Sequence, residues 1–225
     1  MYLSYSRYKL YYEEFGTDKA GTIICLHGWL GSHKDFDFMR MTNLGRDYRI
    51  ICMDFLGFGK SSRPWHEKFY TISSFVDQMS AVAGHFKVER PILIAFSMGG
   101  IVALEYAASH GAGKLILACP PLKHAWLNKL LRFFGRIRLS KTMHSLVLTL
   151  KQKNFVEEIS KLNVPTHIFY GESDLLVKFD PQPVENLRNV SLIKYNGGHR
   201  TALPGLKYIL EDNLNSPLAP TPQTM

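Results

Sequence analysis

A strand-like run and a helix-like run meet at Ala95–Phe96–Ser97–Met98–Gly99–Gly100. Residues 91–96 are continuously apolar, which is typical of a strand covered on both faces. Residues 98–110 carry apolar side chains at helical spacing, and Gly111 or Gly113 would end that helix. A serine on such a sharp turn projects its hydroxyl above the sheet edge, where it can act as a nucleophile. Ser97 is therefore the candidate nucleophile.

The turn requires small residues two positions before and two positions after the serine, because the backbone is crowded there. Ala95 and Gly99 fill these places. The usual signature has glycine in the first place, so Ala95 is a departure that keeps the small size. The alternative interpretation is an ordinary serine at a glycine-rich helix start that binds an anion. The preceding strand-like run argues against this alternative.

Strand-like and helix-like patterns alternate along most of the chain. Residues 71–86 have apolar side chains at helical spacing, with Thr71 as the predicted N-cap. Residues 8–15 are rich in aromatic side chains and are predicted to form an edge strand. The other predicted strands lie at residues 22–26, 50–53, 91–96, 114–119, 166–170 and 191–195. This alternation predicts an α/β fold with a mostly parallel sheet.

A serine hydroxyl needs a base, and the base needs an orienting acid. Asp174 follows the predicted strand at residues 166–170, and His199 follows the next strand after a pair of glycines. Both can therefore meet Ser97 at one sheet edge, in the chain order serine, acid, histidine. Glu172 is the competing acid, and the competing interpretation of His199 is a surface loop histidine. The sequence predicts a catalytic triad of Ser97, His199 and Asp174.

A tetrahedral intermediate also needs N–H donors for its oxyanion. One predicted donor is the backbone N–H of Met98, the residue after the nucleophile. The other is assigned to Trp29 in the loop after residues 22–26, with Leu30 as the alternative. His27 in the same loop is interpreted as structural, because His199 already supplies the base.

Five motifs occur in an order that resembles the α/β-hydrolase superfamily, over about residues 8 to 213. They are HGW at 27–29, DFLGFGKS at 54–61, AFSMGG at 95–100, GESD at 171–174 and GGH at 197–199. The resemblance implies the α/β-hydrolase fold, with a mostly parallel central sheet flanked by helices. It also implies ester or thioester chemistry, since epoxide hydrolases and haloalkane dehalogenases place an aspartate where Ser97 stands. The elbow that begins with alanine resembles that of some minimal lipases. Asp54 is interpreted as a carboxylate that braces its loop.

The segment after the predicted strand at residues 114–119 breaks the alternation. In this superfamily an insertion there forms a lid, so we expect a hydrolase core at residues 1–120 and 164–214, a short helical lid at 121–163 and a flexible tail at 215–225. Residues 121–153 contain eight basic residues and no acidic residue, which equals the formal net charge of +8. The basic residues are Lys123, Lys129, Arg132, Arg136, Arg138, Lys141, Lys151 and Lys153.

Apolar residues interleave with these basic residues, so three interpretations stay open. The lid can present a solvated basic surface, dock an acidic partner, or contact an anionic membrane surface. The candidate acidic partner is an acyl carrier protein or a coenzyme A thioester, with Arg132, Arg136 and Arg138 as contact residues. Docking of that kind would resemble the carboxylesterases of this superfamily that cleave a pimeloyl-carrier-protein methyl ester in biotin synthesis.

Composition and charge bear on the cellular compartment, on membrane insertion and on binding of nucleic acid, metal or cofactor. The three cysteines, at positions 25, 52 and 119, lie in or beside apolar runs and are predicted to be buried free thiols, which suits the cytoplasm. The N-terminus lacks the apolar core of a signal peptide, and no apolar run approaches transmembrane length. No nucleic-acid motif accompanies the basic charge, and no metal or cofactor is expected.

The predicted function is hydrolysis of a carboxylic ester through an acyl-enzyme, with a small-molecule ester or acyl thioester as substrate. A thioesterase, a C–C bond hydrolase and an acyltransferase share the same triad and remain alternatives. A non-catalytic binding module is disfavoured, because no member of the triad is missing.

Overall fold

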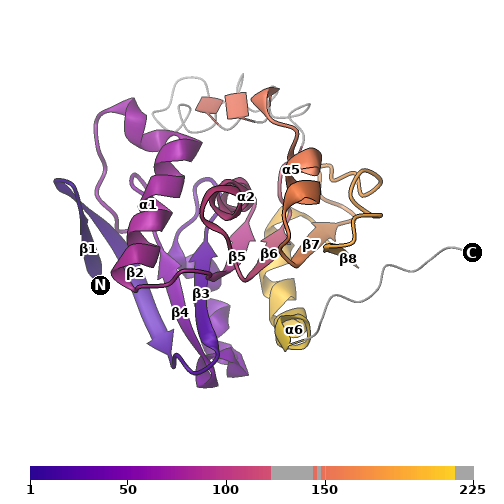
Figure 1. Ribbon diagram of the computed structural model, residues 1–225, viewed down its shortest axis with the longest axis horizontal. Coiled ribbons are helices and arrows are strands. Elements are labelled where there is room, and N and C mark those ends of the chain that lie inside the picture. Colours follow the sequence, from indigo (N-terminus) through magenta and orange to yellow (C-terminus); the bar gives the residue numbers. More distant parts are fainter. Residues whose placement is uncertain (123–143, 146–147, 150, 216–225) are drawn as a thin grey trace, which may run out of the picture.

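The computed structural model describes residues 1–122, 144–145, 148–149 and 151–215. Eight strands form one sheet in the order β1-β2-β4-β3-β5-β6-β7-β8 (Figure 1). From β4 to β8 all neighbouring strands are parallel, whereas β1 and β2 are antiparallel to their neighbours. The strands are β1 (Tyr2–Tyr5), β2 (Tyr8–Gly16), β3 (Gly21–Leu26), β4 (Tyr48–Met53), β5 (Ile92–Phe96), β6 (Lys114–Ala118), β7 (Thr166–Gly171) and β8 (Val190–Tyr195). The predicted mostly parallel α/β fold is therefore confirmed.

The strand predicted as an edge strand, at residues 8–15, is β2, and the short strand β1 covers part of its outer edge. β1 pairs with Tyr8 to Tyr11 of β2, and β4 pairs with Tyr12 to Gly16. The sequence prediction missed β1 because its four side chains alternate only between exposed and half-buried. So short a run lacks the buried face that makes a strand recognisable in sequence.

Helices cover both faces of the sheet. The helices α1 (Ile72–His85), α2 (Met98–His110) and α5 (Phe155–Lys161) pack on one face. On the other face lie α6 (Ala202–Asn215) and the 3-10 helix His33–Met41. Side chains of the central strands alternate between the two cores, as Ile24 and Leu26 of β3 belong to the first and Ile23 and Cys25 to the second. This double burial is why the central strands are continuously apolar in sequence.

Two predicted helix boundaries are confirmed. The hydroxyl of Thr71 caps α1 by accepting the N–H of Ser74 at 3.1 Å. Gly111 ends α2 with a φ of 83°, a backbone conformation that favours glycine.

The segment predicted as a lid is described only in part. Residues 123–143, which include Arg132, Arg136 and Arg138, lie outside the described residues, as do residues 216–225 of the predicted tail. In the described part, Phe155 and Ile159 of α5 are buried in the same core as α1 and α2. Residues 155–161 thus pack with the core, and the predicted limits of the lid stay a prediction. Among the described residues, no helix has both the length and the apolar character to cross a bilayer.

Candidate active site

Ser97 occupies the turn between β5 and α2. Its backbone lies in a region that residues other than glycine rarely adopt, with φ at 51° and ψ at −118°. The N–H of Ser97 donates to the carbonyl of Ala118 at 2.8 Å, which holds the turn against β6. A Cβ on Gly99 would lie 2.3 Å from the carbonyl oxygen of Leu26, so glycine is required there. Ala95, at the other small position, is fully buried, so its methyl group is accommodated.

The structure brings the three predicted triad residues together. Nε2 of His199 lies 2.9 Å from Oγ of Ser97, and Nδ1 of His199 lies 2.7 Å from Oδ2 of Asp174. The ring of Phe96 packs beside the imidazole, with the ring centroids 4.9 Å apart. The side chain of His199 is 12% exposed and that of Asp174 only 1%, so the site opens to solvent on the side of the histidine. This geometry allows a proton to pass from the serine hydroxyl to the imidazole.

Backbone N–H groups hold the carboxylate of Asp174 in place. Its Oδ1 accepts the N–H groups of Leu176 at 2.9 Å and Val177 at 2.8 Å, which leaves Oδ2 for the imidazole. Burial raises the pKa of Asp174, but hydrogen bonds from His199, from the N–H of Val177 and from the thiol of Cys119 outweigh it and bring the pKa below its usual value. Asp174 is therefore a carboxylate at neutral pH.

The competing acid, Glu172, lies elsewhere. Its side chain is 57% exposed and pairs with Nζ of Lys194 at 2.6 Å. Two residues along a turn are enough to direct one carboxylate at the histidine and the other at solvent. The structure thus places Asp174 at the imidazole and leaves Glu172 on the surface.

Of the two predicted oxyanion donors, Met98 follows Ser97 in the chain and Trp29 lies in a turn that packs against Ser97. Met98 is the first residue of α2, so its N–H has no acceptor within the helix. Trp29 belongs to the turn after β3 that is closed by the N–H of Gly31 donating to the carbonyl of Gly28 at 3.0 Å. A Cβ on Gly28 would lie 3.1 Å from Cβ of Ser97, so this turn packs directly against the nucleophile. The alternative donor Leu30 is exposed and has a φ of 64°.

His27 and Asp54 brace loops, as interpreted from the sequence. The buried ring of His27 contacts the carbonyl oxygen of Gly28 at 2.7 Å and accepts the N–H of Phe55 at 3.2 Å. Burial lowers the pKa of His27, which keeps this bridge neutral. The buried carboxylate of Asp54 accepts the N–H of Lys60 at 2.7 Å and contacts Nδ1 of His33 at 2.9 Å.

Sequence reasoning missed two polar side chains beside the triad. Cys119 follows β6 and Tyr195 ends β8, and Sγ of Cys119 lies 3.3 Å from the hydroxyl of Tyr195. Sγ of Cys119 and the facing atoms of Asp174 and His199 lie within 4.8 Å of one another. Burial raises the pKa of Cys119 to about 12, so the thiolate that would bind a metal ion is disfavoured. The three cysteines are buried, as predicted, but their apolar surroundings in sequence gave no sign of this contact.

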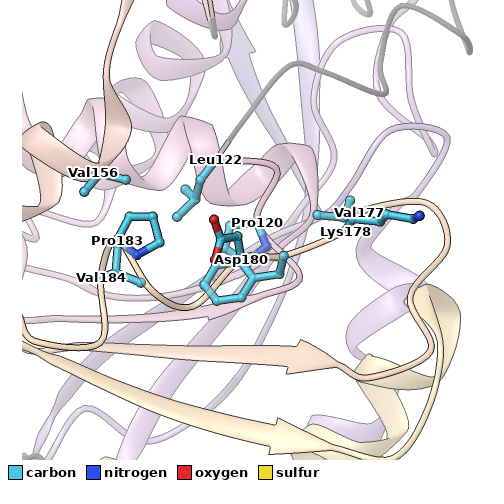
Figure 2. Close-up of a pocket in the computed structure, with 9 residues that line it drawn as sticks. Pro120, Leu122, Val156, Val177, Lys178, Asp180, Pro183 and Val184 are labelled. Carbon is cyan, nitrogen blue, oxygen red and sulfur yellow. The ribbon is translucent and has the colours of Figure 1, made fainter.

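A shallow hollow with room for about one water molecule lies on the α5 side of the sheet edge (Figure 2). It adjoins the site, because Val177 in its wall donates to Asp174 and Pro120 directly follows Cys119. The ammonium group of Lys178 points away from the other labelled side chains. The lining is mostly apolar and consists of Pro120, Leu122, Val156, Val177, Lys178, Phe179, Asp180, Pro183 and Val184.

Comparisons with known proteins agree with this architecture. A family model described as alpha/beta hydrolase fold matches residues 21–142. The AB hydrolase superfamily protein YisY of Bacillus subtilis is 28% identical over 93% of this chain and 94% of its own length. A bifunctional esterase/perhydrolase from Acinetobacter calcoaceticus is 23% identical over 84% of this chain and 88% of its own. An esterase structure from Exiguobacterium antarcticum superposes with a TM-score of 0.76 at 22% identity, covering 92% of this chain and 94% of that one.

Proposed function

Because this chain belongs to the alpha/beta hydrolase fold family, we propose that it is a serine hydrolase that cleaves a carboxylic ester through an acyl-enzyme on Ser97. The observation that carries the proposal is the chain of contacts from Oγ of Ser97 through His199 to Asp174, at 2.9 and 2.7 Å. An esterase among the relatives supports ester chemistry.

In the first half of the reaction, Nε2 of His199 takes the proton of Ser97 as Oγ attacks the ester carbonyl. Asp174, fixed by two backbone N–H groups, keeps the other imidazole proton on Nδ1 and stabilises the positive charge that forms. The N–H groups of Met98 and Trp29 stabilise the oxyanion. His199 then protonates the departing alcohol, which leaves the acyl group on Ser97.

In the second half, His199 takes a proton from water, and the resulting attack releases the acid and restores Ser97. The mostly apolar lining of this shallow hollow, which includes Val177 next to Asp174, would contact the apolar part of a short ester. A series of p-nitrophenyl esters of increasing acyl length would then show a preference for short or medium chains over long ones.

Labelling by a fluorophosphonate probe tests the nucleophile directly. The wild-type protein should be labelled stoichiometrically on the peptide that contains Ser97, and Ser97→Ala should neither be labelled nor hydrolyse p-nitrophenyl esters above background. Full esterase activity in Ser97→Ala would refute the proposal.

A carrier-bound acyl substrate is the finer form of this proposal. It rests on the eight basic residues between positions 121 and 153, which would attract an acidic carrier. Arg132, Arg136 and Arg138 lie outside the described residues, so this part stands on charge alone. The role in biotin synthesis and the cytoplasmic location likewise stay predictions from sequence.

A further inference from the structure

Tyr195 lies between the two loops that carry the acid and the base. We call residues 171–174 the acid loop and residues 197–199 the base loop. The hydroxyl of Tyr195 donates to the carbonyl of Gly198 at 2.7 Å, directly before His199, and lies 3.3 Å from Sγ of Cys119. Sγ also lies within 4.8 Å of a carboxylate oxygen of Asp174. Cys119 and Tyr195 therefore lie between the carboxylate of Asp174 and the base loop.

Glycines in both loops make room for the tyrosine ring. A Cβ on Gly171 would lie 2.7 Å from the hydroxyl of Tyr195, and a Cβ on Gly197 would lie 2.9 Å from its ring. Backbone bonds join the same segments, since the N–H of Ser173 donates to Gly197 at 3.1 Å and the N–H of Glu172 donates to Tyr195 at 3.1 Å. The phenol thus fills a space that the glycine motifs leave open.

Both polar groups stay protonated over the working range of an esterase. Burial raises the pKa of Cys119 to about 12, and burial together with Cys119 also raises the pKa of Tyr195. The phenol proton is directed at Gly198. The thiol of Cys119 carries one proton, with the phenol oxygen at 3.3 Å and a carboxylate oxygen of Asp174 within 4.8 Å, so it donates to one of these oxygens at a time. Cys119 has a φ of 49°, and its N–H donates to the carbonyl of Phe169 at 2.8 Å, which fixes where the thiol points.

Resting on the proposed function, we propose that Cys119 and Tyr195 are positioning residues that couple the acid loop to the base loop and hold Asp174 and His199 in reactive alignment. They do not touch the reacting atoms. Their effect is on the orientation of the imidazole and on the charge that Asp174 presents to it.

Kinetics of Cys119→Ala, Cys119→Ser and Tyr195→Phe on a p-nitrophenyl ester test this role. Cys119→Ala and Tyr195→Phe should each lower kcat about 3- to 10-fold with KM little changed. Because the two residues act together, kcat of the double variant should be about the same as kcat of the more impaired single variant. Cys119→Ser, which keeps a donor, should stay within about two-fold of wild type. In Cys119→Ala the carboxylate has one donor fewer and favours imidazolium more, so the acidic limb of the kcat/KM profile should move to higher pH.

Two matched controls separate positioning from general destabilisation. Cys52→Ala removes a buried thiol on the same face of the sheet, and Tyr106→Phe removes a buried phenol oxygen on α2. Both should change thermal stability without moving kcat or the pH profile. The positioning role would be overturned if Cys119→Ala and Tyr195→Phe left both kcat and the acidic limb of the kcat/KM profile unchanged. It would also be overturned if the two control variants lost as much kcat. Neither result would contradict the proposed function. Activity that survives in Ser97→Ala would overturn the proposed function itself.

Discussion

The side-chain amide of an Asp174→Asn variant would reverse one hydrogen bond. The amide would donate to Nδ1 of His199, so the ring proton would sit on Nε2. A protonated Nε2 cannot accept the proton of Ser97. We expect kcat to fall roughly 10³- to 10⁴-fold with little change in melting temperature. Glu172→Gln is the matched control and should keep kcat within about two-fold of wild type, because its carboxylate faces solvent. The reverse pattern would identify Glu172 as the acid.

His167 on β7 is a second residue whose chemistry can be tested. It is buried, and within the described residues neither ring nitrogen has a hydrogen-bond partner. Burial and the nearby charge of Lys114 lower the pKa of His167 to about 4, against about 6.5 in an unfolded chain. The folded state therefore holds fewer protons on this ring than the unfolded state between these two pH values.

This difference predicts acid sensitivity of the fold. The contribution of neutral His167 to the free energy of unfolding is fully present above about pH 6.5. As the pH falls towards 4 the free energy of unfolding drops by up to roughly 3 kcal/mol. His167→Leu replaces an unpaired polar ring by an apolar side chain of similar size. It should raise the free energy of unfolding by about 1 kcal/mol or more at pH 7 and flatten its decline between pH 6.5 and 4.5. Urea unfolding at several pH values measures both, and an unchanged pH dependence would contradict the assignment.

At the scale of elements, the start of α2 depends on the absence of a side chain at Gly99. A Cβ there would meet the carbonyl oxygens of Leu26 at 2.3 Å and His27 at 2.8 Å, which are backbone atoms that cannot move without shifting the end of β3. Gly99→Ala should therefore destabilise the protein by about 2 kcal/mol and disturb the turn that presents Ser97. Urea unfolding gives the stability, and fluorophosphonate labelling reports on the turn.

Gly84 supplies the matched control within α1. A Cβ at Gly84 meets nothing within 4 Å, so Gly84→Ala gains helix propensity without a clash. We expect it to raise the free energy of unfolding by about 0.5 to 1 kcal/mol. Equal responses at the two glycines would show that crowding at β3 is not what requires Gly99.

For the whole molecule, the arrangement of layers decides where a partner can act. All parallel strands end at the edge that carries Ser97, Asp174 and His199, and the segment at residues 121–153 begins at that same edge after β6. Part of that segment is tied to the core, because Ser145 accepts the N–H of Ile72 at 3.1 Å and Lys153 pairs with Glu105. The described residues on either side of positions 123–143 therefore lie against the core, with Leu122 packed on it and Lys153 paired with Glu105.

Charge reversal tests whether this charge recruits an acidic carrier. We expect the triple variant Arg132→Glu, Arg136→Glu, Arg138→Glu to lower turnover of an acyl-carrier-protein ester on the order of 10-fold at low salt, because a few charge pairs are lost. Its turnover of p-nitrophenyl acetate should be unchanged. The control reverses Lys19, Lys87 and Lys161, which are exposed and precede β3, β5 and β7 at the opposite edge. Equal turnover of the carrier substrate in both triple variants would contradict docking of an acidic carrier on residues 121–153.

Local patterns in the sequence were sufficient for seven of the eight strands, the helices α1 and α2, the serine turn and the three triad candidates. These features follow from periodicity and from the small residues that a crowded turn requires, and both are written in neighbouring residues. The sequence could not show that β1 pairs with half of β2, that Glu172 faces solvent while Asp174 faces His199, or that Cys119 and Tyr195 meet between the two loops. Such contacts join residues far apart in the chain. Their distances depend on strand register and on the packing of loops at the sheet edge, so only the tertiary structure decides them.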